Sequence, residues 1–122
     1  KVNLNSAFTG TPVADAGILV ERGDSADVEV LWNETNDNWT LTNDGTNYHA
    51  IARKYVQTLA TSATSYVVTH NLATQDVMVQ VSEVASPYAK VETDMELTSA
   101  NTITLRFATA PSAGAYKVVV IG

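Results

Sequence analysis

Apolar and polar residues alternate along much of this chain with a period of two, the period that places successive side chains on opposite faces of a β-strand. The clearest early run is 28–33, where apolar residues occupy the first, third and fifth positions. The pattern resumes with Trp39 and Leu41 after the polar connection 34–38, whose Asn and Asp residues are typical of a hairpin turn. This part of the chain is therefore predicted to form strands.

Turn signals organise the rest of the N-terminal part. The Asp-Gly pair at 44–45 predicts a type I′ turn, so residues 28–51 are interpreted as a three-stranded meander. The residues before it are interpreted as an extended arm with a short strand at 18–20. We predict an N-terminal β module over residues 1–52, made of this arm and the meander.

Alternating runs separated by Pro, Gly, Asn and Ser residues follow in the C-terminal part. They cover residues 66–69, 77–82, 91–97, 103–107 and 116–121. Short strands with turn signals at short intervals are typical of a small β-sandwich or barrel. The stretch 51–59 is interpreted as a linker or short strand. We therefore predict an all-β chain, in which the N-terminal extended arm and β-meander are followed by a small β-sandwich over residues 56–122.

The last predicted strand is apolar on both faces. Tyr116, Val118 and Val120 share one face, while Val119 and Ile121 share the other. A strand buried on both faces lies either at the centre of a sheet or in a subunit interface. In a domain this small we predict the second arrangement, with these five residues in an oligomer interface.

Composition excludes several classes of partner. Charged residues make up 16% of the 122 residues, below the usual quarter, and the net charge is −6. Because nucleic-acid binding depends on Lys and Arg, and this chain has seven, we predict no nucleic-acid partner. The absence of Cys excludes disulfides, thiolate metal sites and a Cys nucleophile. No apolar run is long enough to span a bilayer, so we predict no membrane insertion.

An aromatic cluster is the first candidate binding site. Trp32, Trp39 and Tyr48 all fall within the N-terminal module. If the two Trp residues are cross-strand neighbours, their rings can stack and add about 0.5–1.5 kcal/mol beyond burial. The alternating positions favour a core or subunit interface. Exposed on the surface, the same residues would form a platform for the sugar rings of a host cell-surface glycan.

Acidic and histidine residues have plainer interpretations than metal binding or catalysis. The Asp residues near the predicted turns lack the spacing of a calcium loop, and Asp is common in turns for its backbone hydrogen bonds. His70 is predicted to end a strand by bonding the following turn. Glu92, Asp94 and Glu96 alternate along one predicted strand and resemble a glycosidase carboxylate set, but such charges are more often solvated. We predict no catalytic residue, no metal site, no cofactor and no enzymatic activity.

Two groups of segments resemble known proteins. In the N-terminal part, GILVERG at 17–23, VEVLW at 28–32 and WTLTNDGT at 39–46 resemble a module of tail-fibre and other virion structural proteins of marine bacteriophages. Leu41 stands where an aromatic residue is more usual in that module. This resemblance implies a role in a virion appendage.

The C-terminal part resembles a domain that recurs at the ends of phage fibres. The similar segments are YVVTHNL at 66–72, DVMVQV at 76–81 and PSAGAYKVVVIG at 111–122. Ala73 stands where that domain has Gly, which leaves the conformation of this turn open because Gly alone tolerates a positive φ freely.

The resemblance implies a homotrimeric, non-enzymatic virion protein, a fibre or appendage segment that contacts other virion proteins. Its expected location is the virion, after assembly in the host cytoplasm. Two alternatives stay open. One is a capsid decoration or collar protein anchored by residues 1–15, and the other is a lectin-like tip that binds a host cell-surface glycan.

Overall fold

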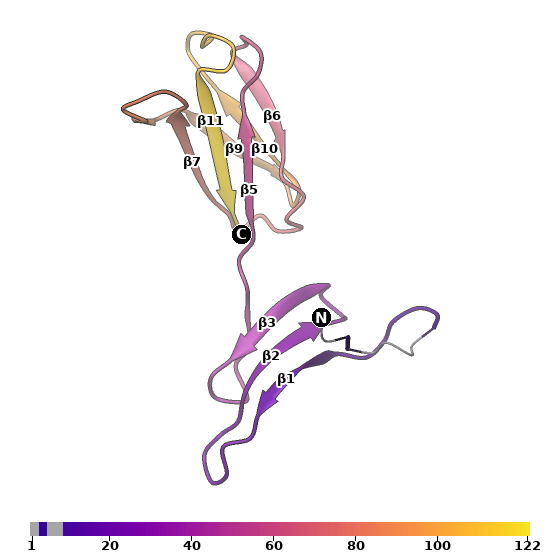
Figure 1. The fold of residues 1–122 in the computed structure, drawn as a ribbon. Coiled ribbons are helices and arrows are strands. Elements are labelled where there is room, and N and C mark those ends of the chain that lie inside the picture. Colours follow the sequence, from indigo (N-terminus) through magenta and orange to yellow (C-terminus); the bar gives the residue numbers. More distant parts are fainter. Residues whose placement is uncertain (1–2, 5–8) are drawn as a thin grey trace. The chain divides into compact units, whose positions relative to one another are not determined.

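The computed structural model describes residues 3–4 and 9–122, and this part of the chain contains strands and no helix. All strand pairs are antiparallel and form three sheets, so the all-β prediction is confirmed. The chain divides into two compact units, residues 1–51 and 52–122, which Figure 1 colours from indigo to yellow. The predicted N-terminal arm includes residues 1–2 and 5–8, which lie outside the described residues. Within the described ranges, no helix could cross a membrane.

The N-terminal unit is a single four-stranded sheet in the order β1-β2-β3-β4. Its strands are β1 (Ala16–Val20), β2 (Val28–Asn33), β3 (Asn38–Thr42) and β4 (His49–Ala50). The predicted meander gains a fourth strand because β1 pairs antiparallel with β2, with Ile18 opposite Val30. The β2–β3 hairpin forms as predicted, with Trp32 opposite Trp39.

The connection between β3 and β4 differs from the predicted type I′ turn. That turn needs a positive φ at both central residues, and of the pair at 44–45 only Gly45 has one, at 69°. The carboxylate of Asp44 instead accepts hydrogen bonds from the backbone N–H groups of Thr46 and Asn47, at 3.0 and 2.7 Å. These bonds stabilise a wider loop, which reaches β4 at His49.

The C-terminal unit has two sheets that face each other across a common core (Figure 1). One sheet has the order β6-β10-β9 and the other the order β5-β11-β7-β8. The strands are β5 (Lys54–Thr58), β6 (Ser65–Thr69), β7 (Met78–Glu83), β8 (Lys90–Val91), β9 (Asp94–Ser99), β10 (Thr102–Arg106) and β11 (Tyr116–Ile121). The stretch left open as linker or strand is thus the edge strand β5.

The core of the sandwich draws alternate residues from both sheets. Its buried apolar side chains are Leu59, Tyr66, Val68, Leu72, Val81, Ile103, Leu105, Val118 and Val120. Five of the nine are 0% exposed. Burying an aliphatic side chain of this size contributes about 1.5–3 kcal/mol, so this unit has a stabilising core of its own.

The predicted strand 91–97 is two strands in different sheets. Val91 of β8 pairs with Val81 in one sheet, while Met95 of β9 pairs with Leu105 in the other. The chain crosses between the sheets at residues 92–93, where the Thr93 hydroxyl donates to the carbonyl of Arg106. An alternating pattern alone does not reveal such a crossing, because both strands keep their apolar residues on the core side.

The interface predicted at the last strand is corrected in part. β11 lies between β5 and β7, and Val118 and Val120 are 0% exposed inside the sandwich. They cannot contact another chain because their own core surrounds them. Tyr116 is partly buried and its ring stacks on Phe107, with centroids 5.7 Å apart. Val119 and Ile121 point to the outer face of the sheet, where an interface stays a prediction.

Candidate functional site

The register of the N-terminal sheet gathers its large apolar side chains on one face. Residues opposite each other on paired strands lie on the same face. Ile18, Val30 and Leu41 form one row across β1, β2 and β3, and Trp32 and Trp39 form a second. Every residue that these three strands place on this face is apolar. We call the surface made by six of them the apolar face: Ile18, Val20, Val30, Trp32, Trp39 and Leu41.

The apolar face is open to solvent. Ile18 is 63% exposed, Val20 is 52% exposed and Trp39 is 44% exposed. Among the described residues of the N-terminal unit, no apolar side chain is buried. Natural sheets cover such a face with a second layer, because a sheet with one bare apolar side lacks the burial that offsets chain entropy. Among the described residues, the N-terminal unit is therefore a single sheet without a second layer packed on its apolar face.

The two tryptophans are in direct contact within the apolar face. Their ring centroids are 5.7 Å apart and the planes cross at 68°, an edge-to-face arrangement. Trp32 and Trp39 are cross-strand neighbours, which meets the condition stated for their stacking. The indole N–H of Trp32 donates to the carboxylate of Glu34 at 2.7 Å. Because the rings are tilted against each other, they do not form one flat platform.

Tyr48 lies apart from the tryptophans, on the opposite face of the sheet. Its hydroxyl donates to the carboxylate of Glu29 at 2.9 Å. Glu29 is one residue from Val30 in β2, so its side chain points away from the apolar face. The hydrogen bond to Glu29 raises the pKa of Tyr48 above its usual value. The structure therefore brings two of the three predicted aromatic residues together and separates the third.

The opposite face of the sheet carries Leu31 beside two threonines whose buried hydroxyls are hydrogen-bonded. Thr40 and Thr42 are 6% and 1% exposed. The hydroxyl of Thr40 donates to the carbonyl of Leu31 at 3.1 Å, and that of Thr42 donates to Asp44 at 2.9 Å. Buried hydroxyls with partners need no further layer. The two faces of this sheet thus differ: the opposite face buries hydrogen-bonded hydroxyls, and the apolar face exposes most of its large apolar side chains.

Charge is divided unequally between the two units. Residues 1–51 hold eight of the thirteen acidic and two of the seven basic residues, while residues 52–122 hold five of each. The net charge of −6 therefore belongs entirely to the N-terminal unit. Its acidic residues lie in the connections or, like Glu29, on the opposite face. The apolar face lies within an acidic unit and contains no charged residue.

The acidic residues of the N-terminal connections bond the backbone. Asp27 accepts the N–H of Arg22 at 2.8 Å, and Asp44 accepts two backbone N–H groups and the side-chain amide of Asn47. These bonds hold the pKa of Asp44 well below its usual range. For both residues the turn interpretation is confirmed. In the described part of the chain no group of three His, Cys, Asp or Glu residues could hold a metal ion.

His70 ends β6 as predicted. It is 3% exposed, and its Nδ1 accepts the backbone N–H of Leu72 at 3.2 Å. Nε2 is buried and has no hydrogen-bond partner among the described residues. Burial lowers the pKa of His70, because desolvation disfavours the imidazolium. The next turn contains Ala73 at a φ of 58°, the left-handed conformation that Gly adopts more easily.

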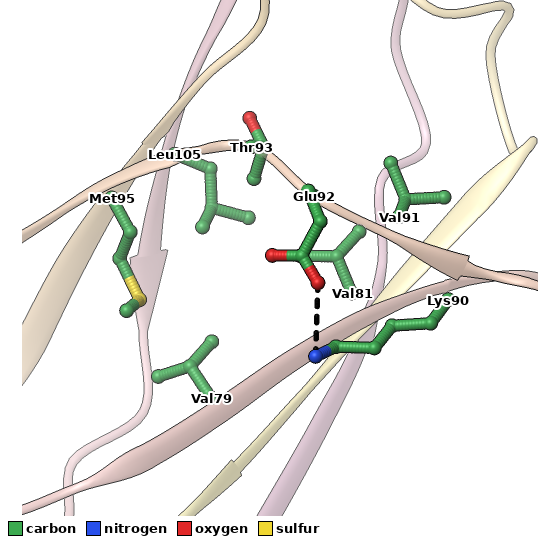
Figure 2. Close-up of a pocket in the computed structure, with 8 residues that line it drawn as sticks. All are labelled: Val79, Val81, Lys90, Val91, Glu92, Thr93, Met95 and Leu105. Atoms are coloured by element: carbon green, nitrogen blue, oxygen red, sulfur yellow. Dashed lines mark ion pairs between the residues drawn. The ribbon is translucent and has the colours of Figure 1, made fainter.

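A small pocket opens between the two sheets of the sandwich, on the side of β8 and β9. Figure 2 shows Val79, Met95 and Leu105 lining it, with the Lys90–Glu92 ion pair beside them. Its volume is about 80 Å³, far below the roughly 300–1,000 Å³ of ordinary ligand pockets.

The three carboxylates predicted to alternate along one strand do not meet in this pocket. Glu92 lies between β8 and β9 and pairs with Lys90 at 2.9 Å. Glu96 pairs with Arg106 on β10 at 2.8 Å. Glu92 is the only one of the three that lines the pocket. This arrangement gives no paired carboxylates around a substrate-sized cavity.

The apolar face is the candidate site that sequence reasoning left incomplete. Trp32 and Trp39 were identified, but Ile18, Val20 and Leu41 were not joined to them. Two signals in the sequence could have pointed there. One is the apolar run 18–20 that precedes the alternating run 28–33, and the other is the excess of acidic residues before residue 52. Neither signal fixes which strands pair.

Comparison with known proteins assigns no family to this chain. No protein-family model, no curated protein and no solved structure matches it. Its function therefore has to be inferred from its own residues and geometry.

Proposed function

We propose that this chain is a non-enzymatic structural segment of a virion fibre or similar appendage and that it works as a homotrimer. The observation that carries the proposal is the contrast in burial. A sandwich with its own core is joined to a sheet whose apolar face is bare. A solvent-exposed apolar surface of this kind usually marks a site of protein contact. Burying this apolar face against other copies of the chain would stabilise the protein.

The sequence resemblance supports the virion part of the proposal. Its N-terminal segments, within 17–46, fall in the four-stranded sheet, and its C-terminal segments, within 66–122, fall in the sandwich. Each resemblance thus covers one compact unit. The proposal includes a location in the virion after assembly in the host cytoplasm, with copies of the chain and other virion proteins as partners.

The proposal is tested at two levels. Light scattering coupled to size exclusion is expected to give three times the 13.0 kDa of the single chain. Immunogold labelling of purified particles from the encoding genome is expected to mark a fibre or appendage. Gold on the capsid shell would favour the decoration alternative, and deleting residues 1–15 would then abolish attachment. A protein absent from particles would contradict both.

A second candidate function is a glycan-binding tip, and the exposure of Trp39 favours it. An aromatic ring open to solvent can stack on a sugar ring, and Trp39 is 44% exposed. A glycan array with the full chain and Trp39→Ala tests this. Tyr88→Ala is the control, because Tyr88 is a 62% exposed aromatic residue of the other unit. Binding lost only with Trp39→Ala would support the tip, whereas no bound glycan would exclude it for the glycans tested.

A further inference from the structure

We infer that the apolar face and the free edge of β1 bind a second copy of this chain, and that the N-terminal sheet is stable only in that assembly. This inference deepens the proposed function by naming the surface and the partner. It makes no use of the virion location. An interface found on another surface would overturn this inference and leave that proposal standing, whereas a monomeric chain would overturn both. The inference can also hold for a self-assembling protein of another kind.

The proposed contact surface includes the free edge of β1 as well as the apolar face. Among the strands that the structure describes, β1 is an edge strand paired on one side only, and its sequence AGILV contains no charged residue and no Pro. Ile18, Leu19 and Val20 are each more than half exposed, although Leu19 points to the opposite face. Edge strands of stable monomers usually carry Lys, Pro or a bulge that blocks pairing with another chain. β1 has none of these residues, so its free edge is open to a neighbouring chain.

Charge favours a second copy over a basic partner. A basic protein attracted by the net charge of −6 would bind where the acidic side chains lie, in the connections and on the opposite face. Docked on the apolar face, it would meet only the border carboxylate of Glu34, which already accepts the indole N–H of Trp32. A second copy presents the same uncharged surface and leaves the acidic residues of both chains at the rim. Like charges then repel only across solvent, where salt screens them.

The expected area shows why the edge of β1 is needed. Strands lie about 4.8 Å apart and rise about 3.3 Å per residue, so three strands of about five residues cover roughly 250 Å². A stable interface of standard size buries about 800 Å² on each partner. The apolar face alone is therefore too small. Contact around β1, or contact with two neighbours per copy, supplies the remaining area.

The outer face of the sandwich is the competing surface. Val56 is 50% exposed and lies opposite Val119 of β11, next to the exposed Ile121. The same face also carries Lys54 opposite Ile121, and Lys117 is two residues from Val119. A symmetric contact there would bring like charges close together. Its apolar residues are therefore a poorer self-complementary surface than the apolar face.

A matched pair of variants separates the two surfaces. Val20 and Val56 have the same side chain and nearly the same exposure, 52% and 50%. In the full chain, Val20→Asp is expected to weaken self-association at least tenfold, measured as the dissociation constant by sedimentation equilibrium. Val56→Asp is expected to change it less than twofold. The opposite ranking would overturn the inference and return the interface to β11.

Salt separates a second copy from a basic partner. For the wild-type chain, raising NaCl from about 50 to 500 mM is expected to strengthen association, because it screens repulsion between acidic units. The same salt would weaken a complex with a basic protein. A chain that stays monomeric at every salt and protein concentration would overturn the inference.

Tryptophan fluorescence tests the coupling to folding. Both tryptophans of the chain belong to the apolar face, so the emission reports on the N-terminal sheet alone. Dilution of the wild type is expected to shift the emission to longer wavelength as the assembly dissociates and the sheet unfolds. Val20→Asp is expected to show the shifted emission already at high concentration. An emission maximum independent of concentration in an associating wild type would contradict the coupling.

Discussion

The two halves of this protein use similar strands in opposite ways. In the sandwich, alternating apolar residues of two sheets face each other, and Ile103, Leu105 and Val118 are fully buried. In the N-terminal sheet, β2 and β3 also place large apolar residues on one face and β1 is apolar throughout, yet Ile18 and Val20 stay more than half exposed. Alternation thus determines which residues share a face. Whether that face is a core or a contact surface depends on what packs against it.

Charge follows the same division. The sandwich is neutral overall, and its ion pairs, Lys90–Glu92 and Arg106–Glu96, lie on its surface. The N-terminal unit carries the whole net charge of −6. Unpaired like charge destabilises a compact unit and keeps it soluble. The exposed apolar face favours association of the N-terminal sheet, and the acidic residues around that face limit aggregation.

The largest effect on stability is expected from an Ile→Ala substitution in the core of the sandwich, compared with the same substitution in the N-terminal sheet. Ile103→Ala, at 0% exposure, is expected to lower the free energy of unfolding of the sandwich by about 2–5 kcal/mol, because it leaves a cavity. Ile18→Ala, at 63% exposure, is expected to leave the sandwich transition unchanged. Urea denaturation followed by circular dichroism measures both. A similar loss from the two variants would remove the distinction between the units.

The second prediction concerns the buried His70 of the sandwich. Its pKa in the folded state is lowered, while the unfolded residue titrates near 6.5. Above pH 6.5 the imidazole is uncharged in both states, so His70 does not lower the free energy of unfolding there. Below that pH the unfolded chain binds a proton that the folded chain excludes. The free energy of unfolding should then fall by at most about 1.4 kcal/mol per pH unit until the lowered pKa is reached.

His70→Asn keeps an acceptor for the N–H of Leu72 and cannot titrate, so it should flatten this pH dependence. His49→Asn, in the exposed β4 of the other unit, is the matched control. Urea midpoints of the sandwich transition between pH 5 and 8 provide the measurement. A pH dependence retained in His70→Asn would assign it to other groups.

The third prediction concerns the pH at which acid destabilises the N-terminal sheet, which is set by Asp44 and not by His70. The pKa of Asp44 is held well below its usual range by hydrogen bonds, so its contribution is complete above the unfolded value near 4. It is lost as the pH falls below that value, because the unfolded carboxylate is protonated first. Tryptophan fluorescence from pH 6 to 2 should show this loss in the wild type and less of it in Asp44→Asn.

Asp24→Asn removes the same charge from the β1–β2 connection and is the control for Asp44→Asn. It should leave the acid transition of the sheet near that of the wild type. If both variants shift the transition equally, net charge and not the Asp44 hydrogen bonds sets the acid limit.

A smaller gain in stability is expected from Ala73→Gly. Ala73 has a φ of 58°, and the left-handed conformation is unfavourable for a residue with a Cβ by about 1–2 kcal/mol. The greater freedom of Gly in the unfolded chain offsets about 0.4–1 kcal/mol of this. A net gain of roughly 0.5–1 kcal/mol should appear as a higher urea midpoint of the sandwich. Ala110→Gly, at an exposed position without a positive φ, should lower that midpoint.

The smallest expected effect comes from the surface ion pairs. The side chains of Arg106 and Glu96 are 54% and 57% exposed, so solvent screens their attraction. Glu96→Gln should change the free energy of unfolding by no more than about 0.5 kcal/mol. Glu92→Gln, whose side chain is 85% exposed, should change it even less. A loss of free energy of unfolding well above about 0.5 kcal/mol from either variant would mean that ion pairs stabilise the sandwich as strongly as buried apolar side chains do.

Local features of the fold were predictable from neighbouring residues. The β2–β3 hairpin, the cross-strand tryptophan pair and the strand ending at His70 follow from alternation and turn chemistry. The doubly apolar pattern of β11 allows a central strand or a subunit interface, and the interface was the arrangement predicted. The structure selects the central position for β11, because strands on both sides bond to it. That choice depends on contacts between segments more than thirty residues apart in the sequence.

The sequence by itself determined the β class and the residues that share each strand face, because these depend on a backbone period of two. Tertiary structure alone decided which strands pair and which faces are covered. It placed Val91 and Met95 in different sheets and joined Ile18 to Val30 and Leu41 across three strands. Burial is a property of what lies opposite a face, and a pattern along one strand carries no information about that neighbour.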